Sequence, residues 1–351
     1  MSALMEQLFA RVRQSGVIIG GVLLVLLLLS FASGIVLAFF YNPSPAGVYE
    51  SMRTIVGVPL LAFIRNIHYW SSDLLVFLLF LHMTRVAITK PTGRARKYAW
   101  WFGVAFLFVI GIEMTIGRFL RADQEAFDAY THFFLGTSGI VAGYIPFAAD
   151  IANAFSGSTA LFRFFILHAV AIPVGIVALA LVHYLFAPTF RSMVYPMKKA
   201  AESSPTPNAP SGWKRLMAFP SMRNLLGLSG SAIAIVLTLS LIAPAPFFPS
   251  PFAGLEVTKP SWWIMWIVAL ENVWGLMPIL LAPPVLFLAL LAVPVYTKDR
   301  PGPDLGTAIY GLSVAVILVL GMWATNAPQV AHTEHFRAEA GIDAHAGHTG
   351  H

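Results

Sequence analysis

The sequence has no cysteine and few charged residues. The absence of cysteine from all 351 residues excludes disulfides, thiolate catalysis, cysteine-held iron–sulfur clusters and thioether-linked haem on this chain. Charged residues make up 11% of the sequence and hydrophobic residues 58%, whereas soluble domains carry about 25% charged residues. This composition predicts a polytopic membrane protein. The net charge of +6 is therefore a topology signal carried by individual loops, and it does not indicate nucleic-acid binding.

Apolar runs long enough to cross a membrane recur along the chain. A spanning helix needs about 20 residues, and the first run is too long for a cleaved signal peptide. We expect seven spanning helices, at residues 17–41, 62–88, 98–120, 160–187, 223–244, 275–296 and 306–325. We expect short interfacial helices in 121–158, and connections at Asn42–Met52 and 245–272. The predicted fold class is an all-α polytopic membrane protein, with a four-helix bundle followed by a three-helix C-terminal part.

Basic residues concentrate before the first predicted helix and in alternate connections, after the second, fourth and sixth. The positive-inside rule places these segments in the cytoplasm. We therefore expect a protein of the inner (plasma) membrane whose C-terminal tail lies on the outer side. The predicted domains are 1–200, a cytoplasmic linker at 201–220, and 221–326, followed by a disordered histidine-rich tail at 327–351.

Two pairs of histidines lie in predicted spanning helices. His68 and His82 are 14 residues apart, and His168 and His183 are 15 apart. In an α-helix, 14 residues fall roughly 40° short of four turns and 15 overshoot by roughly 60°, so each pair stays on one side, about 21–22 Å apart along the axis. That separation puts one histidine in each half of a hydrocarbon core about 30 Å thick. Two such helices face to face offer two stacked His–Fe–His sites, as two b-type haems need.

Glycines repeat the same interval in two neighbouring predicted helices. Gly20 and Gly34 are 14 residues apart, and so are Gly103 and Gly117. Glycine lets a flat macrocycle approach the backbone closely, although it also permits tight packing between membrane helices. The shared interval favours haem clearance.

Three arginines accompany the histidines: Arg65 and Arg85 bracket the first pair, and Arg163 precedes the second. A guanidinium near a haem edge can pair with propionates, and the alternatives are structural pairing or snorkelling to the interface. Without haem, the intramembrane histidines would serve a proton relay or structural hydrogen bonds.

Motifs in five places resemble cytochrome b of the Rieske/cytochrome b (quinol:cytochrome c reductase) complexes. They read S-G-I-V-L-A-F-F-Y at 33–41, R-N-I-H at 65–68 with L-H-M-T-R at 81–85, G-R-F-L-R-A-D-Q at 117–124, R-F-F-I-L-H at 163–168 and T-K-P-S-W-W at 258–263. The 15-residue histidine interval and the end after seven helices resemble the chloroplast and cyanobacterial branch, with its haem part and three-helix part fused here. That branch's extra covalent haem is not implied, because cysteine is absent.

The resemblance implies a set of ligands, cofactors and partners. His68 and His168 would bind a low-potential haem near the outer side, and His82 and His183 a high-potential haem near the cytoplasm. A quinol-oxidation pocket would lie between the segments after the third and fifth helices, beside the outer haem, with a quinone-reduction pocket near the inner haem. Partners would be the quinone pool, lipid, a Rieske iron–sulfur protein and a c-type cytochrome, in a homodimer or larger complex. One quinol electron would go to a partner, and the other would cross the membrane.

Two positions depart from the family's motifs. The usual L-P-W-[GD]-Q appears as L-R-A-D-Q at 120–124, and P-E-W-Y appears as P-S-W-W at 260–263. Ser261 thus replaces the carboxylate that would accept a quinol proton, and serine is no base near neutral pH without activation. Arg121 puts a cation where the family has proline. The candidates for proton handling that lie near in the sequence are Asp123, Glu125, Asp128, His132 and Glu271.

Two other functions compete with this interpretation. A dihaem membrane anchor would connect the quinone pool to a multisubunit dehydrogenase or reductase, without a bifurcating quinol site. A haem-free transporter or assembly scaffold would also use seven helices.

In the tail, five histidines offer a weak divalent-metal site, although their irregular spacing favours disorder: His332, His335, His345, His348 and His351.

Overall fold

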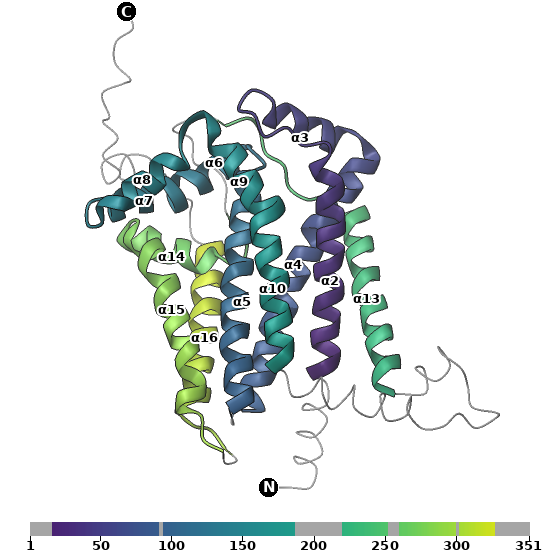
Figure 1. The fold of residues 1–351 in the computed structure, drawn as a ribbon, viewed down its shortest axis with the longest axis vertical. Helices are drawn as coiled ribbons and strands as arrows, with labels where there is room; N and C mark the ends of the chain where they lie inside the picture. Colours follow the sequence, from purple (N-terminus) through teal and green to yellow (C-terminus); the bar gives the residue numbers. More distant parts are fainter. Residues whose placement is uncertain (1–15, 91–93, 187–219, 252–259, 300–301, 327–351) are drawn as a thin grey trace, which may run out of the picture.

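The computed structural model describes residues 16–90, 94–186, 220–251, 260–299 and 302–326. Seven helices in these residues are long and apolar enough to cross a membrane (Figure 1). They are α2 (Gly16–Ala38), α4 (Pro59–Ile88), α5 (Arg94–Phe119), the continuous run of α9 (Ala160–Ile166), η3 (Leu167–Ala171) and α10 (Ile172–Phe186), α13 (Pro220–Ile242), α15 (Met277–Tyr296) and α16 (Leu305–Asn326). The predicted all-α fold and its seven spans are confirmed. The predicted linker 201–220, apart from Pro220, and the histidine-rich tail lie outside the described residues.

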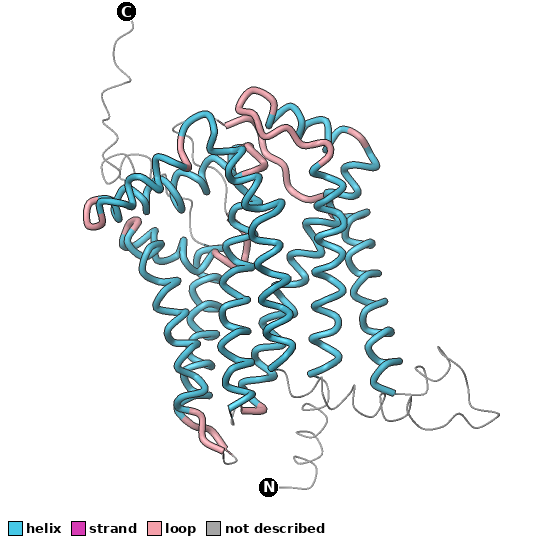
Figure 2. The backbone as a smooth tube through the Cα atoms, viewed as in Figure 1, coloured by secondary structure: helices cyan, strands magenta, loops and turns pink. Residues whose placement is uncertain are grey.

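Short helices gather at one end of the bundle, which we call the capped end (Figure 2). They are α3 (Val48–Gly57), α6 (Gln124–Tyr130), η1 (Thr131–Gly136), α7 (Thr137–Ala142) and α8 (Pro146–Ala154). The last four confirm the short helices expected in 121–158. The connection expected at Asn42–Met52 is wrong in its second half, because α3 begins at Val48 and buries Val48 and Met52. Likewise, the expected connection 245–272 contains most of α14 (Met265–Trp274).

The last three spanning helices lie on two sides of the first four. The helix α13 packs against α2 and α4, whereas α15 packs against α5 and α16 (Figure 1). Asn66 on α4 joins α13 to the bundle, because its amide donates to the Ser240 carbonyl and accepts from the Ala245 backbone N–H, both at 2.9 Å. The division of the chain into domains at 1–200 and 221–326 stays a prediction.

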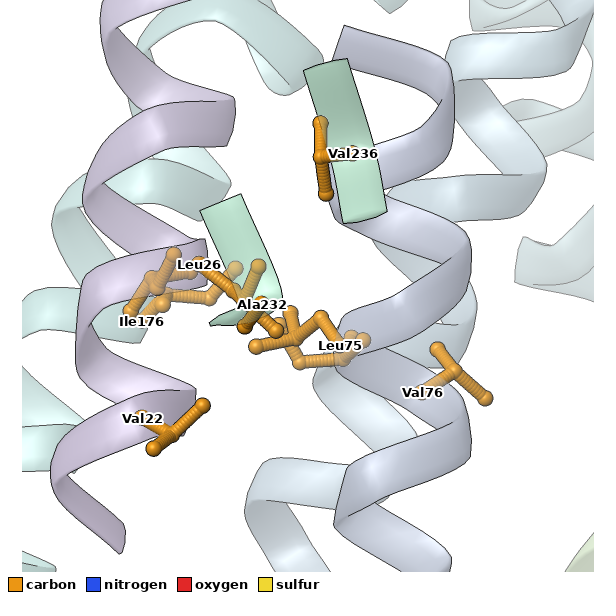
Figure 3. Close-up of a cluster of buried hydrophobic side chains, with 9 residues drawn as sticks. Val22, Leu26, Leu75, Val76, Ile176, Ala232 and Val236 are labelled. Carbon is orange, nitrogen blue, oxygen red and sulfur yellow. The ribbon is translucent and has the colours of Figure 1, made fainter. Parts of the chain in front are cut away.

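A layer of apolar side chains fills the middle of the bundle (Figure 3). Leu26 of α2, Ile176 of α10 and Val236 of α13 are fully buried there, and Leu75 of α4 is 4% exposed. Leu75 lies midway between His68 and His82 in the sequence, and Ile176 lies between His168 and His183. The layer therefore separates two levels of histidines. Because lipid is as apolar as leucine, van der Waals packing rather than escape from water holds this layer together.

Candidate functional site: two facing histidine pairs

The four intramembrane histidines form two facing pairs. His68 of α4 faces His168 of η3, with ring centroids 6.1 Å apart and planes at 87°. His82 of α4 faces His183 of α10, with centroids 6.5 Å apart and planes at 70°. The first pair lies nearer the capped end, and we call it the capped-end pair; the second is the far pair. Each pair thus joins α4 to the η3–α10 run.

These separations suit a metal bound between two imidazoles. Metal-bound histidine nitrogen lies at about 2.0–2.1 Å from its metal, and a ring centroid lies about 1.1 Å behind its nitrogen, so a bis-histidine metal separates two centroids by about 6.3 Å. The two measured values lie on either side of this distance. Within the described ranges no group of three or more potential metal ligands forms, and each pair offers two imidazoles to one metal.

A π-helical turn accounts for the unequal histidine spacing. His168 lies within η3, where hydrogen bonds run from residue i to i+5 and one turn holds an extra residue. Pro173 follows in α10 and has no N–H to donate to the Ala169 carbonyl, which breaks the regular ladder at this point. Because the turn holds one extra residue, the 15 residues from His168 to His183 turn through about the same angle as the 14 residues from His68 to His82. The difference between the two helices that was calculated for regular α-helices is therefore removed.

The Nδ1 atoms of the capped-end pair are engaged. His68 Nδ1 lies 2.9 Å from the Ser30 carbonyl and 3.4 Å from the Ser33 hydroxyl. His168 Nδ1 lies 3.0 Å from Glu113 Oε1 and 3.3 Å from the Glu113 carbonyl. An engaged Nδ1 fixes the ring and leaves Nε2 for a metal, which is the usual arrangement of metal-bound histidine.

The far pair is held differently. His82 Nδ1 is buried without a hydrogen-bond partner in the described part of the chain. His183 Nδ1 is buried too and approaches the Ala99 carbonyl without reaching hydrogen-bonding geometry. The two levels therefore differ in the groups behind their imidazoles.

Three of the four predicted glycines lie against the imidazoles. A Cβ on Gly34 would meet His68 Cε1 at 2.9 Å, and one on Gly117 would meet His168 Cε1 at 2.7 Å. A Cβ on Gly103 would lie 3.4 Å from His183 Cε1, whereas one on Gly20 would meet nothing within 4 Å. These three glycines thus give room to the imidazole rings. The sequence interval alone did not distinguish this from room for a macrocycle.

The predicted arginines have separate surroundings. Arg65 is buried and donates to the carbonyls of Ala245 and Pro246, at 2.9 and 2.5 Å, so its guanidinium holds the chain that follows α13. Arg85 is half-buried on α4, and Arg163 is exposed on α9. The structural pairing considered for Arg65 is therefore present.

Asp123 and Glu125 belong to a buried ionic network at the capped end. Glu125 accepts from Arg118 at 3.2 Å and from Arg121 at 2.5 Å. Asp123 caps α6 through the Ala126 N–H and also accepts from the Phe248 N–H, both at 3.0 Å. Burial raises the pKa of Asp123, although Arg121 and these backbone donors oppose the change. Asp123 thus holds α6 to the segment after α13, and Glu125 holds α6 to the end of α5.

Glu271 pairs with His132 across the capped end. Glu271 Oε1 of α14 lies 2.5 Å from His132 Nδ1 of η1, with side chains 4% and 11% exposed. The pair joins the segment after α5 to the segment after α13. Ser261 lies elsewhere in this second segment, next to Trp262, whose indole N–H donates to Asp73 Oδ2 at 3.0 Å.

Two carboxylates were missed in the sequence. Asp73 lies in the spanning helix α4 and Glu113 in α5. Their presence inside apolar runs was the available signal, because intramembrane carboxylates are costly and usually functional.

The structure is a seven-helix membrane bundle with facing histidines at two levels, an arrangement suited to a membrane cytochrome. The family model described as Cytochrome b/b6/petB matches residues 5–190. Cytochromes b6 of Prochlorococcus marinus (strain MIT 9211) and Synechococcus sp. (strain WH7803) are 30% identical over 178 residues, which cover 48% of this chain and 78% of each relative. The chain belongs to the cytochrome b/b6 family, as its motifs indicated, and the family implies b-type haem.

A solved structure shares the fold over nearly the whole chain. It is described as a hyperthermophilic respiratory Complex III and matches with a TM-score of 0.68 at 18% identity, covering 93% of this chain and 88% of that one. The match extends beyond residue 190, so it includes helices of the C-terminal part.

Proposed function

We propose that this chain is a dihaem cytochrome b subunit that carries electrons across a membrane between quinol or quinone and partner redox subunits. The proposal rests on one observation: two facing histidine pairs, at 6.1 and 6.5 Å, in one transmembrane bundle. His68 and His168 would hold one haem, and His82 and His183 the other. Each haem, when bound, supplies reversible one-electron chemistry at its iron.

The protein's own contribution is ligation, orientation and exclusion of water. Hydrogen bonds from Nδ1–H to the carbonyls of Ser30 and Glu113 fix the rings of His68 and His168, and Gly34 and Gly117 let these rings lie against the backbone. The apolar layer of Leu26, Leu75 and Ile176 keeps the space between the two levels dry. Exclusion of water lowers the local dielectric, which strengthens the influence of nearby charges on both sites.

We propose an inner-membrane location with cytoplasmic basic loops, on the positive-inside rule. The capped end then faces outward and carries the quinol-oxidation site, between η1 and α14. The partners would be a Rieske protein and a c-type cytochrome, or other redox subunits, in a homodimer or larger complex. The solved structure described as a Complex III and the cytochrome b6 relatives support this assignment.

Within that site, the pair of Glu271 and His132 is the proposed proton acceptor for quinol. The pair is buried at the junction of η1 and α14, and a carboxylate bonded to imidazole can take up a proton and pass it on. Asp123 and Glu125 are weaker candidates, because their hydrogen bonds and ion pairs are already used within the capped end.

The second candidate function keeps both haems without bifurcation. It is favoured by Ser261, which has no carboxylate, and by the ion pairs of Arg118 and Arg121 with Glu125. The chain would then anchor a dehydrogenase or reductase to the quinone pool. Inhibitor-insensitive electron flow in a purified complex without a Rieske subunit would support the anchor; inhibitor-sensitive quinol oxidation with one would exclude it.

Spectra of the reduced and oxidised protein test haem binding directly. We expect two low-spin haems per chain, and one each in His82→Ala and His168→Ala. His132→Gln is the matched control, because His132 lies in the same bundle and faces Glu271 rather than another histidine. Two haems in either alanine variant would contradict the proposed ligands. No haem in the unmodified chain would contradict the function and leave the transporter or scaffold.

A further inference from the structure

Glu113 is a carboxylate that points at a proposed haem ligand. It lies in the spanning helix α5, with its side chain 12% exposed, and its Oε1 is 3.0 Å from His168 Nδ1. Its other oxygen, Oε2, is buried without a hydrogen-bond partner among the described residues. A carboxylate in this position is costly inside a membrane, and neither the fold nor the quinol site uses it.

The contact changes the chemistry of the imidazole. The hydrogen bond of Nδ1 goes to the Glu113 backbone carbonyl at 3.3 Å, and the carboxylate lies beside the same nitrogen at 3.0 Å. A carboxylate this close to Nδ1–H makes the ring more basic, so that it would bind through Nε2 with more imidazolate character. A more basic ligand and a nearby negative charge both stabilise the oxidised iron, which carries one more positive charge than the reduced iron. The expected consequence is a lower reduction potential at that level.

The other three histidines lack such a partner in the described part of the chain. His68 meets neutral acceptors, the Ser30 carbonyl and the Ser33 hydroxyl. His82 and His183 have no partner at Nδ1 within hydrogen-bonding geometry. The carboxylate therefore acts on one level of the bundle, and it makes the two levels electronically unequal.

We propose that Glu113 is a positioning residue that lowers the reduction potential of the capped-end haem through His168. Electron transfer from the capped-end level to the far level then runs downhill along the bundle. The inference rests on the proposed dihaem function, and it names a residue that sets the direction of electron transfer between the two haems.

Redox titration of Glu113→Gln, followed at the absorbance of each haem, tests the proposal. We expect the equilibrium constant for transfer from the capped-end haem to the far haem to fall about tenfold, which is about 59 mV for one electron. The far haem should keep its potential and serve as the internal control. Glu113→Asp keeps the charge and should shift the potential less, and Glu50→Gln, exposed on α3, should shift neither haem.

Unchanged potentials in Glu113→Gln, or equal shifts at both haems, would overturn the proposal. If this variant does not assemble, near-infrared magnetic circular dichroism of the unmodified ferric protein decides. Imidazolate character in one of two haems supports the role of Glu113, and two identical neutral-imidazole signatures exclude it. Absence of bis-histidine haem would instead refute the proposed function itself, so the two failures are distinguishable.

Discussion

The imidazole of His168 lies between the backbone of Gly117 and the carboxylate of Glu113. On the opposite ring, Gly34 approaches His68, whose Nδ1 faces the Ser30 carbonyl. Each ring is thus confined from one side by a glycine and held on Nδ1 by a polar group. A side chain in place of either glycine would push on a ring that cannot swing away without losing its hydrogen bond.

We expect Gly117→Ala to disturb the capped-end haem. Its Cβ would lie 2.7 Å from His168 Cε1 and 3.2 Å from Nδ1, so the ring must shift, and overpacking of this kind costs about 1–3 kcal/mol. Haem content and the reduced-minus-oxidised spectrum should show loss or displacement of one haem. Gly227→Ala is the control, because Gly227 is exposed on α13 and its Cβ would meet nothing within 4 Å. A Gly117→Ala protein with both haem signals unshifted would refute this steric argument.

At the level of elements, π-helical turns occur at both places where the proposed chemistry lies. The turn η3 carries His168, and the turn η1 carries His132. Such turns are frequent at functional sites because they alter side-chain direction without ending the helix. In η3 the turn aligns a 15-residue spacing with a 14-residue one, and in η1 it accompanies the contact with α14.

We expect Glu271→Gln to slow quinol oxidation at least about tenfold while leaving both haem spectra unchanged, since a positioned acid–base group contributes about 10²–10⁴-fold. Steady-state turnover with a soluble quinol across a pH series is the measurement. Glu50→Gln removes an exposed carboxylate on α3 and should turn over normally. An unaltered rate and pH profile in Glu271→Gln would remove the pair from the proton path and favour the anchor function.

Across the whole molecule, one ion pair ties the chain's first half to its second at the far end. Lys90, just after α4, lies 2.8 Å from Asp304, just before α16, whose side chain is 1% exposed. Burial alone would raise the pKa of Asp304, but hydrogen bonds from Lys90, from the Thr307 side chain and backbone and from the Lys298 backbone hold it well below its usual value. The connections after α4 and after α15 therefore meet at one end, as the alternation of basic loops predicted.

We expect Asp304→Asn to lower the Tm by about 2–4 °C at neutral pH. Because the folded-state pKa is depressed, the stabilisation is complete above the ordinary aspartate pKa of about 3.9 and is lost as pH falls below it. The difference between the two proteins should therefore be constant from pH 6 to 8 and shrink under acid, as measured by thermal unfolding in detergent. Asp150→Asn, at an exposed site on α8, should leave the Tm unchanged; a difference that grew under acid would contradict the sign.

Much of this arrangement could be predicted from the sequence. The lengths of the apolar runs predicted the seven spanning helices. The histidine intervals predicted two levels, because the spacing of residues in a helix fixes their separation along the axis and the side on which they lie. These residues are His68, His82, His168 and His183. Motifs around these residues identified the family. The haem and quinone roles remain predictions.

Tertiary structure alone decided the partners of each group. Glu113 and His168 are 55 residues apart, and His132 and Glu271 are 139 apart. No local sequence pattern encodes such contacts, since they depend on which helices pack together and at what position along their axes. The sequence by itself therefore determined the helices, the histidine levels and the family. Packing between helices determined which carboxylate touches an imidazole, which glycine confines one, and how a π-turn brings two unequal spacings into register.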